Sequence, residues 1–192
     1  MIYTFLANGF EDVEALAPVD VLRRAGLEVT TVSINETKEV TSAHGVTMLA
    51  DTLLADNNYD DADLLFLPGG MPGAENLDNC EPLKEALVKQ NMRGGRIAAI
   101  CAAPFVLGKL GILSGHRATC YPGFEGILDG ADYNGDVFVT DGNITTGEGP
   151  AAALPFAYEL VRLLKDEATA EALAEGMRFK HLCQQFTGSS SI

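Results

Sequence analysis

The most informative stretch of this sequence is Arg96-Ile97-Ala98-Ala99-Ile100-Cys101-Ala102-Ala103-Pro104, in which a β-type apolar run stops at a thiol. The small residues that follow are typical of a sharp turn from a strand into a helix, which pushes its central side chain out of the sheet. Ala99 and Ala103 meet the size limit of such a turn. We therefore interpret Cys101 as a candidate nucleophile, and we expect the N–H groups of the following helix to lower its thiol pKa. The alternative is a structural cysteine packed between alanines.

Strand-like and helical patterns alternate along the chain, which is typical of a parallel sheet covered by helices on both faces. We expect strands over residues 2–7, 28–34, 64–67, 96–100, 117–120, 137–140 and 143–146, and helices over 13–24, 82–92, 104–110, 150–165 and 167–178. A turn at His44-Gly45 predicts a small added hairpin within residues 40–49. We expect Pro18 to kink the first helix or to confine its regular part to the later residues.

The bulk properties predict a small cytoplasmic domain. The 192 residues are enough for one core, so we expect a single domain over 1–180 and a disordered C-terminal tail over 181–192. With 13 basic and 27 acidic side chains the net charge is −14, which disfavours nucleic acid and anionic lipid as partners. The N-terminus lacks the features of a secretory signal, and no apolar run reaches the roughly 20 residues that span a bilayer. We therefore expect no membrane association and reduced thiols.

Four features fall at the carboxyl ends of expected strands, where ligands gather in open parallel sheets. They are residues 9–14, the pair Gly69-Gly70, Cys101 itself, and residues 147–150. Glu14 has apolar neighbours and is expected to turn inward; beside the thiol it would share a proton, leaving a protonated Glu14 next to a Cys101 thiolate. The N–H groups of the glycine pair and of Ala102 are candidate donors to an oxyanion, although an ordinary strand-ending turn also explains the glycines.

The remaining thiols do not indicate a metal site. The cysteines at 80, 101, 120 and 183 lack Cys-x-x-Cys spacing, and only three histidines are present, so we expect neither a zinc site nor another cofactor. We interpret Cys80 and Cys183 as structural. Cys120 ends an expected strand near the same edge as Cys101, and we expect it to be a neighbour of the site.

Taken together, four ordered motifs resemble the ThiJ/PfpI superfamily, and within it the Parkinsonism-associated deglycase branch that includes YajL-type chaperones. The motifs are Ala7-Asn8-Gly9-Phe10-Glu11-Asp12-Val13-Glu14, Pro18-Val19-Asp20-Val21-Leu22-Arg23-Arg24-Ala25-Gly26, Leu67-Pro68-Gly69-Gly70 and Ala98-Ala99-Ile100-Cys101-Ala102-Ala103-Pro104. The resemblance covers residue 1 to about residue 175. It implies a flavodoxin-like three-layer α/β sandwich, usually a homodimer.

The same resemblance implies roles for particular residues. It implies an oxidation-prone Cys101 with Glu14 as its partner, and oxyanion donors at Gly70 and Ala102, with Gly69 lining the site. It also implies that Arg24 approaches the site of the other subunit across the dimer interface.

Three positions depart from the pattern of that branch. Tyr121 stands before a proline where a histidine is common, so an imidazole is lost there but a hydrogen-bond donor remains. The usual Gly-Pro-Gly-Thr turn appears as Gly147-Glu148-Gly149-Pro150, which adds a carboxylate, and His44 stands where an arginine is common. We expect these residues to line the site and to change substrate preference more than the fold.

The activities found in the superfamily require different residues, so this sequence favours some of them over others. Proteolysis is disfavoured because Ala102 follows Cys101 and no His-x-Glu is present to take the thiol proton. The leading hypothesis is attack by Cys101 on a small reactive carbonyl such as methylglyoxal, or on its adduct with an amine or thiol, with Glu14 moving the proton that leads to lactate. In the terms of the family this is glyoxalase III or deglycase activity, without metal or glutathione. The alternatives are a redox sensor or redox-regulated chaperone that is oxidised at Cys101, and a binding module without catalysis.

Overall fold

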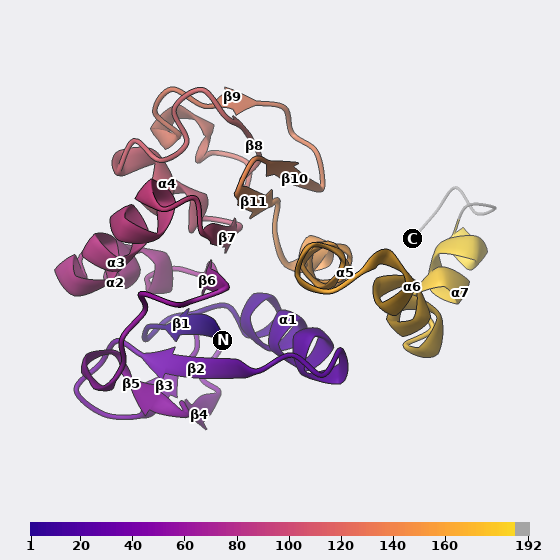
Figure 1. Ribbon diagram of the computed structural model, residues 1–192, viewed down its shortest axis with the longest axis horizontal. Helices are drawn as coiled ribbons and strands as arrows, with labels where there is room; N and C mark the ends of the chain where they lie inside the picture. Colours follow the sequence, from indigo (N-terminus) through magenta and orange to yellow (C-terminus); the bar gives the residue numbers. More distant parts are fainter. Residues whose placement is uncertain (187–192) are drawn as a thin grey trace.

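The computed structural model describes residues 1–186, and its centre is a seven-stranded sheet (Figure 1). Along the sheet the strands follow the order β10 (Phe138–Asp141), β11 (Ile144–Gly147), β7 (Arg96–Ile100), β6 (Leu64–Leu67), β1 (Ile2–Leu6), β2 (Val29–Ser33) and β5 (Thr52–Leu53). All neighbouring strands are parallel except β10 and β11, which form an antiparallel hairpin. The predicted, mostly parallel sheet is therefore confirmed.

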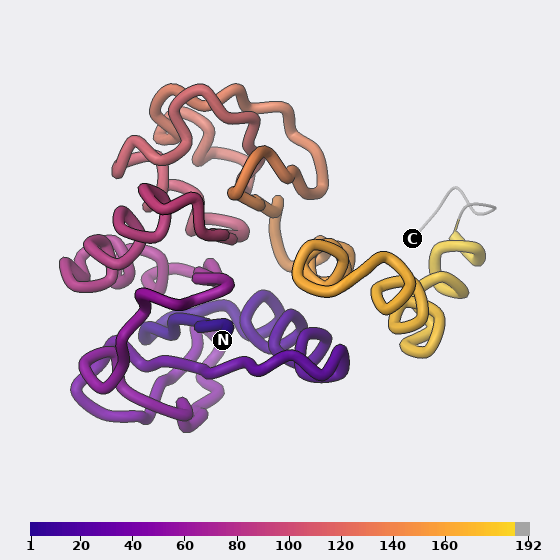
Figure 2. Tube along the Cα trace, in the orientation of Figure 1, coloured from indigo at the N-terminus to yellow at the C-terminus, as the bar shows by residue number. Residues whose placement is uncertain are grey.

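Helices cover both faces of this sheet. One face carries α1 (Asp12–Arg24) and α5 (Ala153–Leu164), which pack against each other, and α6 (Glu167–Gly176) packs on α5. The other face carries α2 (Gly73–Asp78), α3 (Glu81–Met92) and α4 (Pro104–Lys109). Figures 1 and 2 show these two groups on opposite sides of the strands, with α7 (Phe179–Phe186) beyond α6 at the far end of the molecule. This arrangement is the expected three-layer sandwich.

Smaller elements decorate the sandwich. The predicted hairpin is formed by β3 (Glu39–Thr41) and β4 (Thr47–Leu49), which pair in antiparallel fashion. A second small sheet, of β8 (Arg117–Ala118) and β9 (Asp132–Tyr133), was not expected from the sequence. Short 3-10 turns occupy Leu54–Asp56, Glu125–Ile127 and Pro150–Ala152. Within residues 1–186, no helix combines the length and the apolar character needed to cross a membrane.

Two sequence-based expectations are corrected by the structure. Helix α1 begins at Asp12 and continues through Pro18, so the helix is not confined to its later part; the proline only withholds the N–H that would bond the carbonyl of Glu14. Residues 181–186 belong to α7, so the expected disordered tail is wrong for them, because a stripe of apolar residues at helical spacing was overlooked. Residues 187–192, the rest of that tail, lie outside the described residues.

The order of the strands positions the candidate site. The four residues of β6 are buried throughout, and Phe66 packs against Phe156 of α5 with ring centroids 5.6 Å apart. Because helices cover both faces of the sheet, every side chain of a central strand is buried, and each large apolar one contributes about 1.5–3 kcal/mol. The central strands are therefore continuous apolar runs in the sequence. From β1 the chain passes first to β2 on one side and later to β6 on the other. Ligands bind at such a switch point, so the loops after β1, β6 and β7 meet where a site is expected.

Candidate active site

Cys101 occupies the turn between β7 and α4 in a strained backbone conformation. Its φ angle is +64°, in the left-handed region that non-glycine residues rarely adopt. The backbone is fixed on both sides, because the N–H of Cys101 donates to the carbonyl of Gly147 (2.9 Å) and its carbonyl accepts from the N–H of Tyr121 (2.8 Å). Strain of this kind costs about 1–3 kcal/mol and persists only where the surroundings impose it. The thiol is therefore held in one place, with 9% of the residue exposed to solvent.

Glu14, from the first turn of α1, points inward to the same place. The residue is fully buried, and its Oε2 accepts a hydrogen bond from the backbone N–H of Gly69 (3.0 Å). Its other oxygen, Oε1, is buried and has no hydrogen-bond partner of regular geometry among the described residues. An oxygen in that position is one that a proton can occupy.

Gly69 lies between the thiol and the carboxyl group and leaves room for both. A Cβ atom added at Gly69 would lie 2.6 Å from Oε2 of Glu14 and 2.7 Å from Cβ of Cys101. Because no side chain fits there, glycine at this position allows the loop after β6 to bring the two groups together.

The ionisation of the two groups is coupled. The pKa of Glu14 is raised to about 7, because burial and the negative charge of Glu11 together outweigh the hydrogen bonds with Cys101 and with the Gly69 N–H, which lower it. Burial, together with the charge of Glu14 and a hydrogen bond to it, raises the pKa of Cys101 to about 12. The direction for Cys101 is opposite to the lowered thiol pKa expected from the sequence, because desolvation and the neighbouring carboxylate outweigh the nearby amides.

The two groups lose their protons in two steps, and each step belongs to the pair and not to one residue alone. Above about pH 7 and up to about pH 12 the pair holds one proton and one negative charge, and below about pH 7 both groups are protonated.

Two backbone N–H groups converge on the sulfur. Hydrogen bonds from Gly70 and Ala102 both act to lower the pKa of Cys101, so both amides face Sγ. Gly70 has a φ of +90°, and a Cβ atom there would lie 2.4 Å from the backbone nitrogen of Glu11. The loops after β1 and β6 lie so close together at Gly70 that only glycine, which has no side chain, can occupy this position. The amides meet the sulfur from two separate loops and not from a long helix, since α4 begins only at Pro104 and has six residues.

The residues that depart from the resembled branch lie around this centre at different depths. Tyr121 is 46% exposed, and its backbone N–H donates to the carbonyl of Cys101, which places it beside the site. Its ring lies close to Gly149. Glu148 is half-buried, and its N–H donates to the carbonyl of Val137, just before β10. Burial and the charges of Cys120, Glu125 and Glu148 raise the pKa of Tyr133, so Glu148 faces the segment between β9 and β10. His44 lies in the β3–β4 turn and contacts Asp12.

The other residues singled out in the sequence are Arg24 and the three remaining cysteines, of which Cys120 is adjacent in the chain to Tyr121, whose N–H bonds the Cys101 carbonyl. Arg24 pairs with Asp20 in the last turn of α1, ten residues and about 15 Å along the helix from Glu14. Cys120 is fully buried, and burial together with Glu125 raises its pKa to about 12. Cys80 precedes α3, where burial raises its thiol pKa, and Cys183 is exposed on α7.

Sequence reasoning missed two groups that act on Glu14. The N–H of Gly69 bonds Oε2, and Oε2 of Glu11 accepts the N–H of Glu14 (2.7 Å) as the cap of α1. The contact of Glu11 with Glu14 could have been predicted from their spacing, because a polar residue three positions before an acid in the first turn is the pattern of a helix cap.

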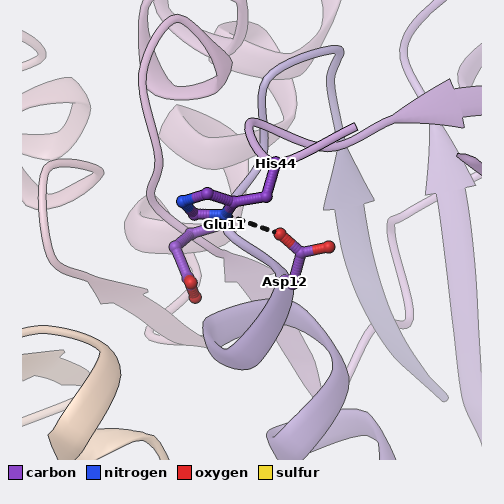
Figure 3. A group of neighbouring side chains, drawn as sticks. All are labelled: Glu11, Asp12 and His44. Carbon is purple, nitrogen blue, oxygen red and sulfur yellow. Dashed lines mark hydrogen bonds and ion pairs between the residues drawn. The ribbon is translucent and has the colours of Figure 1, made fainter. Parts of the chain in front are cut away.

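One group of described side chains has the composition of a metal site. Ligand atoms of Glu11, Asp12 and His44 lie within 4.8 Å of one another (Figure 3). Oδ2 of Asp12 and Nδ1 of His44 are hydrogen-bonded to each other (2.9 Å), and Oε2 of Glu11 accepts the N–H of Glu14, so one atom of each side chain is already used within the protein.

Comparison with known proteins places this geometry in a family. "Protein DJ-1 homolog B" of Arabidopsis thaliana is 43% identical over 169 residues, which cover 86% of this chain and 39% of that protein. The chain therefore spans about two fifths of the length of this plant relative. "Glutathione-independent glyoxalase DJR-1.2" of Caenorhabditis elegans is 33% identical over 85% of this chain and 87% of its own length.

A solved structure shows the same architecture. The crystal structure of DJ-1beta from Drosophila melanogaster superposes with a TM-score of 0.88 and 37% identity, covering 92% of this chain and 96% of that one. Residues 1–163 match the DJ-1/PfpI family as a whole. The strained cysteine with its buried glutamate therefore lies within a recognised framework, and this chain belongs to the DJ-1/PfpI family.

Proposed function

We propose that the protein converts small reactive carbonyl compounds, of the methylglyoxal type, to hydroxy acids by a cysteine-dependent reaction that uses no cofactor. The observation that carries this proposal is the convergence at Cys101 of the Glu14 carboxyl group and the N–H groups of Gly70 and Ala102. The glyoxalase named above, a relative of 33% identity, supports the same class of reaction.

The first step is addition of the sulfur to the aldehyde. The shared proton moves from the thiol to Glu14, whose Oε1 is free to take it, and the thiolate so formed attacks the aldehyde carbon. The carbonyl electron pair moves to oxygen, where the amides of Gly70 and Ala102 stabilise the negative charge until Glu14 returns the proton. The product is a hemithioacetal.

The second step is an internal rearrangement that needs no external oxidant. The Glu14 carboxylate removes the proton from the former aldehyde carbon to give an enediolate, and the same proton is delivered to the neighbouring carbon. The hydroxyl proton on the former aldehyde oxygen passes to the oxygen of that neighbouring carbon, so the hemithioacetal becomes a thioester of lactate. Water then hydrolyses the thioester and regenerates the thiol. A carboxyl group whose pKa is raised to about 7 suits this role, because it both releases and binds a proton near neutral pH.

The same chemistry extends to adducts of the carbonyl with protein amines or thiols, as in a deglycase. Tyr121 is the exposed residue beside the site that would contact such a carrier. Free methylglyoxal reacts by addition alone, with no leaving group. A hemiaminal or hemithioacetal adduct must first release its amine or thiol, which takes up the hydroxyl proton and restores the aldehyde that the thiolate attacks.

We further propose that the protein acts as a homodimer. Exposed apolar side chains gather on the first turns of α1 and on the β3–β4 hairpin, namely Val13, Leu16, Val46 and Leu49. The hydrogen bond between His44 and Asp12 ties these two elements together. An apolar surface of this kind next to the site favours contact with a second copy.

The test of the activity measures methylglyoxal consumption and lactate release. Cys101→Ser is expected to lose turnover completely, and Glu14→Ala to lose it by roughly a hundredfold to ten-thousandfold, the range for general acid–base groups. Cys183→Ser, which changes an exposed thiol on α7, is the matched control and is expected to keep full activity.

The competing function is a redox sensor, and the same geometry supports it. The amides of Gly70 and Ala102 and a protonated Glu14 would also stabilise the oxygens of a sulfinate on Cys101. If wild-type protein shows no turnover, while mass spectrometry finds that Cys101 gains two oxygens under mild peroxide, the sensor function replaces the enzymatic one.

A further inference from the structure

Residues 118–149, here called the wall segment, are tied to Cys101 near both of their ends. The N–H of Tyr121 donates to the carbonyl of Cys101 (2.8 Å), and the carbonyl of Gly147 accepts the N–H of Cys101 (2.9 Å). Between these two bonds the chain passes through β9, β10 and β11, and Figure 1 shows these strands gathered with β7 at one side of the molecule. The charge of the wall segment therefore belongs to the surroundings of the thiol.

The wall segment carries only negative charges. It contains no lysine, arginine or histidine, and its six acids are Glu125, Asp129, Asp132, Asp136, Asp141 and Glu148. Asp141 accepts the N–H of Arg117 (2.8 Å) and is held at the outer end of β10. Glu125 accepts the N–H of Gly123 (2.8 Å), two residues after Tyr121. Glu148 directly follows Gly147, so Glu125 and Glu148 are the acids tied to the backbone around Cys101.

The alternation of side chains along β11 fixes the direction of Glu148. Its N–H donates to the carbonyl of Val137 (3.0 Å), so the pairing of β11 with β10 continues one residue beyond Gly147. A Cβ atom at Gly147 would lie 3.0 Å from a phenylalanine ring of α5, whereas Oγ1 of Thr146 accepts the N–H of Thr119 on the opposite side. Successive side chains of a strand point to opposite faces, so Glu148 projects to the same side as Thr146, toward the stretch that leads to Tyr121.

The carboxylate of Glu148 is available to a ligand. Within residues 1–186, no side chain forms a hydrogen bond or an ion pair with it. Tyr121, 46% exposed, has its ring 3.1 Å from the place of a Cβ atom at Gly149, and Tyr133, 37% exposed, lies on the neighbouring strand β9. Exposed aromatic faces attract cations, as a carboxylate without a counter-ion does.

A second observation shows that the site has room for a polar ligand group. Glu14 is fully buried at the base of the site, and its Oε1 has no hydrogen-bond partner of regular geometry among the described residues. Buried polar atoms are nearly always partnered, so this oxygen is open to a proton or to a group of a bound molecule. The acids of the wall segment therefore stand beside a site with an unfilled polar position.

We propose that the wall segment selects the charge of the molecules that reach Cys101, with Glu148 as the specificity-determining residue. The site favours reactive carbonyl compounds whose carrier is positively charged and disfavours those whose carrier is an anion. The inference rests on the proposed function for the identity of the carbonyl compound, whereas the charge preference concerns access to the thiol and holds for any electrophile.

The experiment compares three methanethiosulfonate reagents that differ in charge: 2-aminoethyl (cationic), methyl (neutral) and 2-sulfonatoethyl (anionic). Their rates are followed by the mass of the tryptic peptide 97–109, which contains Cys101 and no other cysteine. The neutral reagent measures the reactivity of the thiol, and a small free thiol gives the intrinsic ratio of the two charged reagents. After this correction, we expect wild-type protein to react about tenfold faster with the cation than with the anion.

Variants of Glu148 separate its charge from its shape. Glu148→Gln should lower the ratio roughly fivefold, the effect of one charge on probes of opposite sign across a water-filled opening. Glu148→Asp should keep the ratio, and Glu148→Lys should reverse the preference. Glu28→Gln is the matched control, because this exposed acid precedes β2 at the opposite edge of the sheet and its loss changes the net charge equally. About 1 M salt should reduce the wild-type ratio toward that of the variant, since screening then acts within about 3 Å.

The proposal is overturned if Glu148→Gln keeps the wild-type ratio, or if Glu28→Gln lowers the ratio as much, because net charge and not the wall segment would then be responsible. Thermal unfolding of each variant identifies folding defects.

Turnover tests the substrate preference separately. The kcat/KM should be higher when thiocholine, a cationic thiol, carries methylglyoxal than when mercaptoacetate carries it, and equal values would contradict the preference. Labelling of Cys101 needs no turnover, so a protein that consumes no methylglyoxal refutes the proposed function while the reagent ratios still decide the role of Glu148.

Discussion

Replacement of Glu14 by glutamine should make the protein more stable at neutral pH, although it removes a group central to the site. Burial raises the pKa of Glu14 from 4.5 to about 7, so the folded state binds its proton more tightly than the unfolded state does. At about 1.4 kcal/mol per pH unit, the ionised carboxylate lowers the free energy of unfolding by about 3 kcal/mol at pH 8 relative to strongly acidic solution.

The sign follows from proton binding. Between pH 4.5 and about 7 the folded state holds the Glu14 proton and the unfolded state has lost it, so the contribution of this group to stability falls as pH rises through that window. Glutamine keeps an oxygen that can accept the N–H of Gly69 but has no such titration. Between pH 5.5 and pH 8 the variant should therefore gain about 2 kcal/mol relative to wild type.

The assay is urea unfolding of both proteins at several pH values, all above the isoelectric point of about 4.4 so that the protein stays in solution. Only the difference between the two proteins is interpreted, which cancels the titration of the other acids. Parallel curves, with the same pH dependence in wild type and variant, would refute the reasoning, because Glu14 would then ionise as freely in the folded state as in the unfolded state.

Two further predictions concern packing and assembly. Gly69→Ala should destabilise the fold by about 1–3 kcal/mol and slow the alkylation of Cys101, because the added methyl group would overlap Glu14 and Cys101; Gly126→Ala, where nothing lies within 4 Å, is the control, and equal stability of the two variants would contradict the prediction. Leu16→Glu and Leu49→Glu should convert a dimer to a monomer in sedimentation velocity, whereas Met92→Glu on α3, at an 82% exposed position, should not; an unchanged sedimentation coefficient in all three would remove this surface as the interface.

The main strands and helices could be predicted from local sequence patterns, because each pattern reflects which side chains are buried. The strand at 96–100 and the strand at 64–67 are apolar on both faces, and the structure buries almost all of their residues. The hairpin at 40–49 was found from its turn residues. The short helix α2 was missed because its six residues are too few to show a helical period.

The candidate site was only partly accessible from sequence. Cys101 and Glu14 were found because a thiol at the end of a strand and an acid among apolar neighbours are local features. The partnership of Gly69 with Glu14, across 55 residues, is a contact between loops and leaves no periodic trace. The thiol pKa was expected in the wrong direction for the same reason, since desolvation depends on how completely the rest of the chain encloses the sulfur.

The sequence by itself determined the alternation of strands and helices, the small residues around the cysteine at the end of a strand, and the acid in the first turn of α1, because these depend on neighbours a few positions away. The tertiary structure alone decided that Glu14, Gly69, Gly70 and Cys101 meet, that the sulfur and the carboxyl group hold one proton between them, and that Glu11 adds its charge to that pair. Proximity and burial arise only when the loops after β1, β6 and β7 close over one another, and electrostatic energies depend on those distances and not on spacing along the chain.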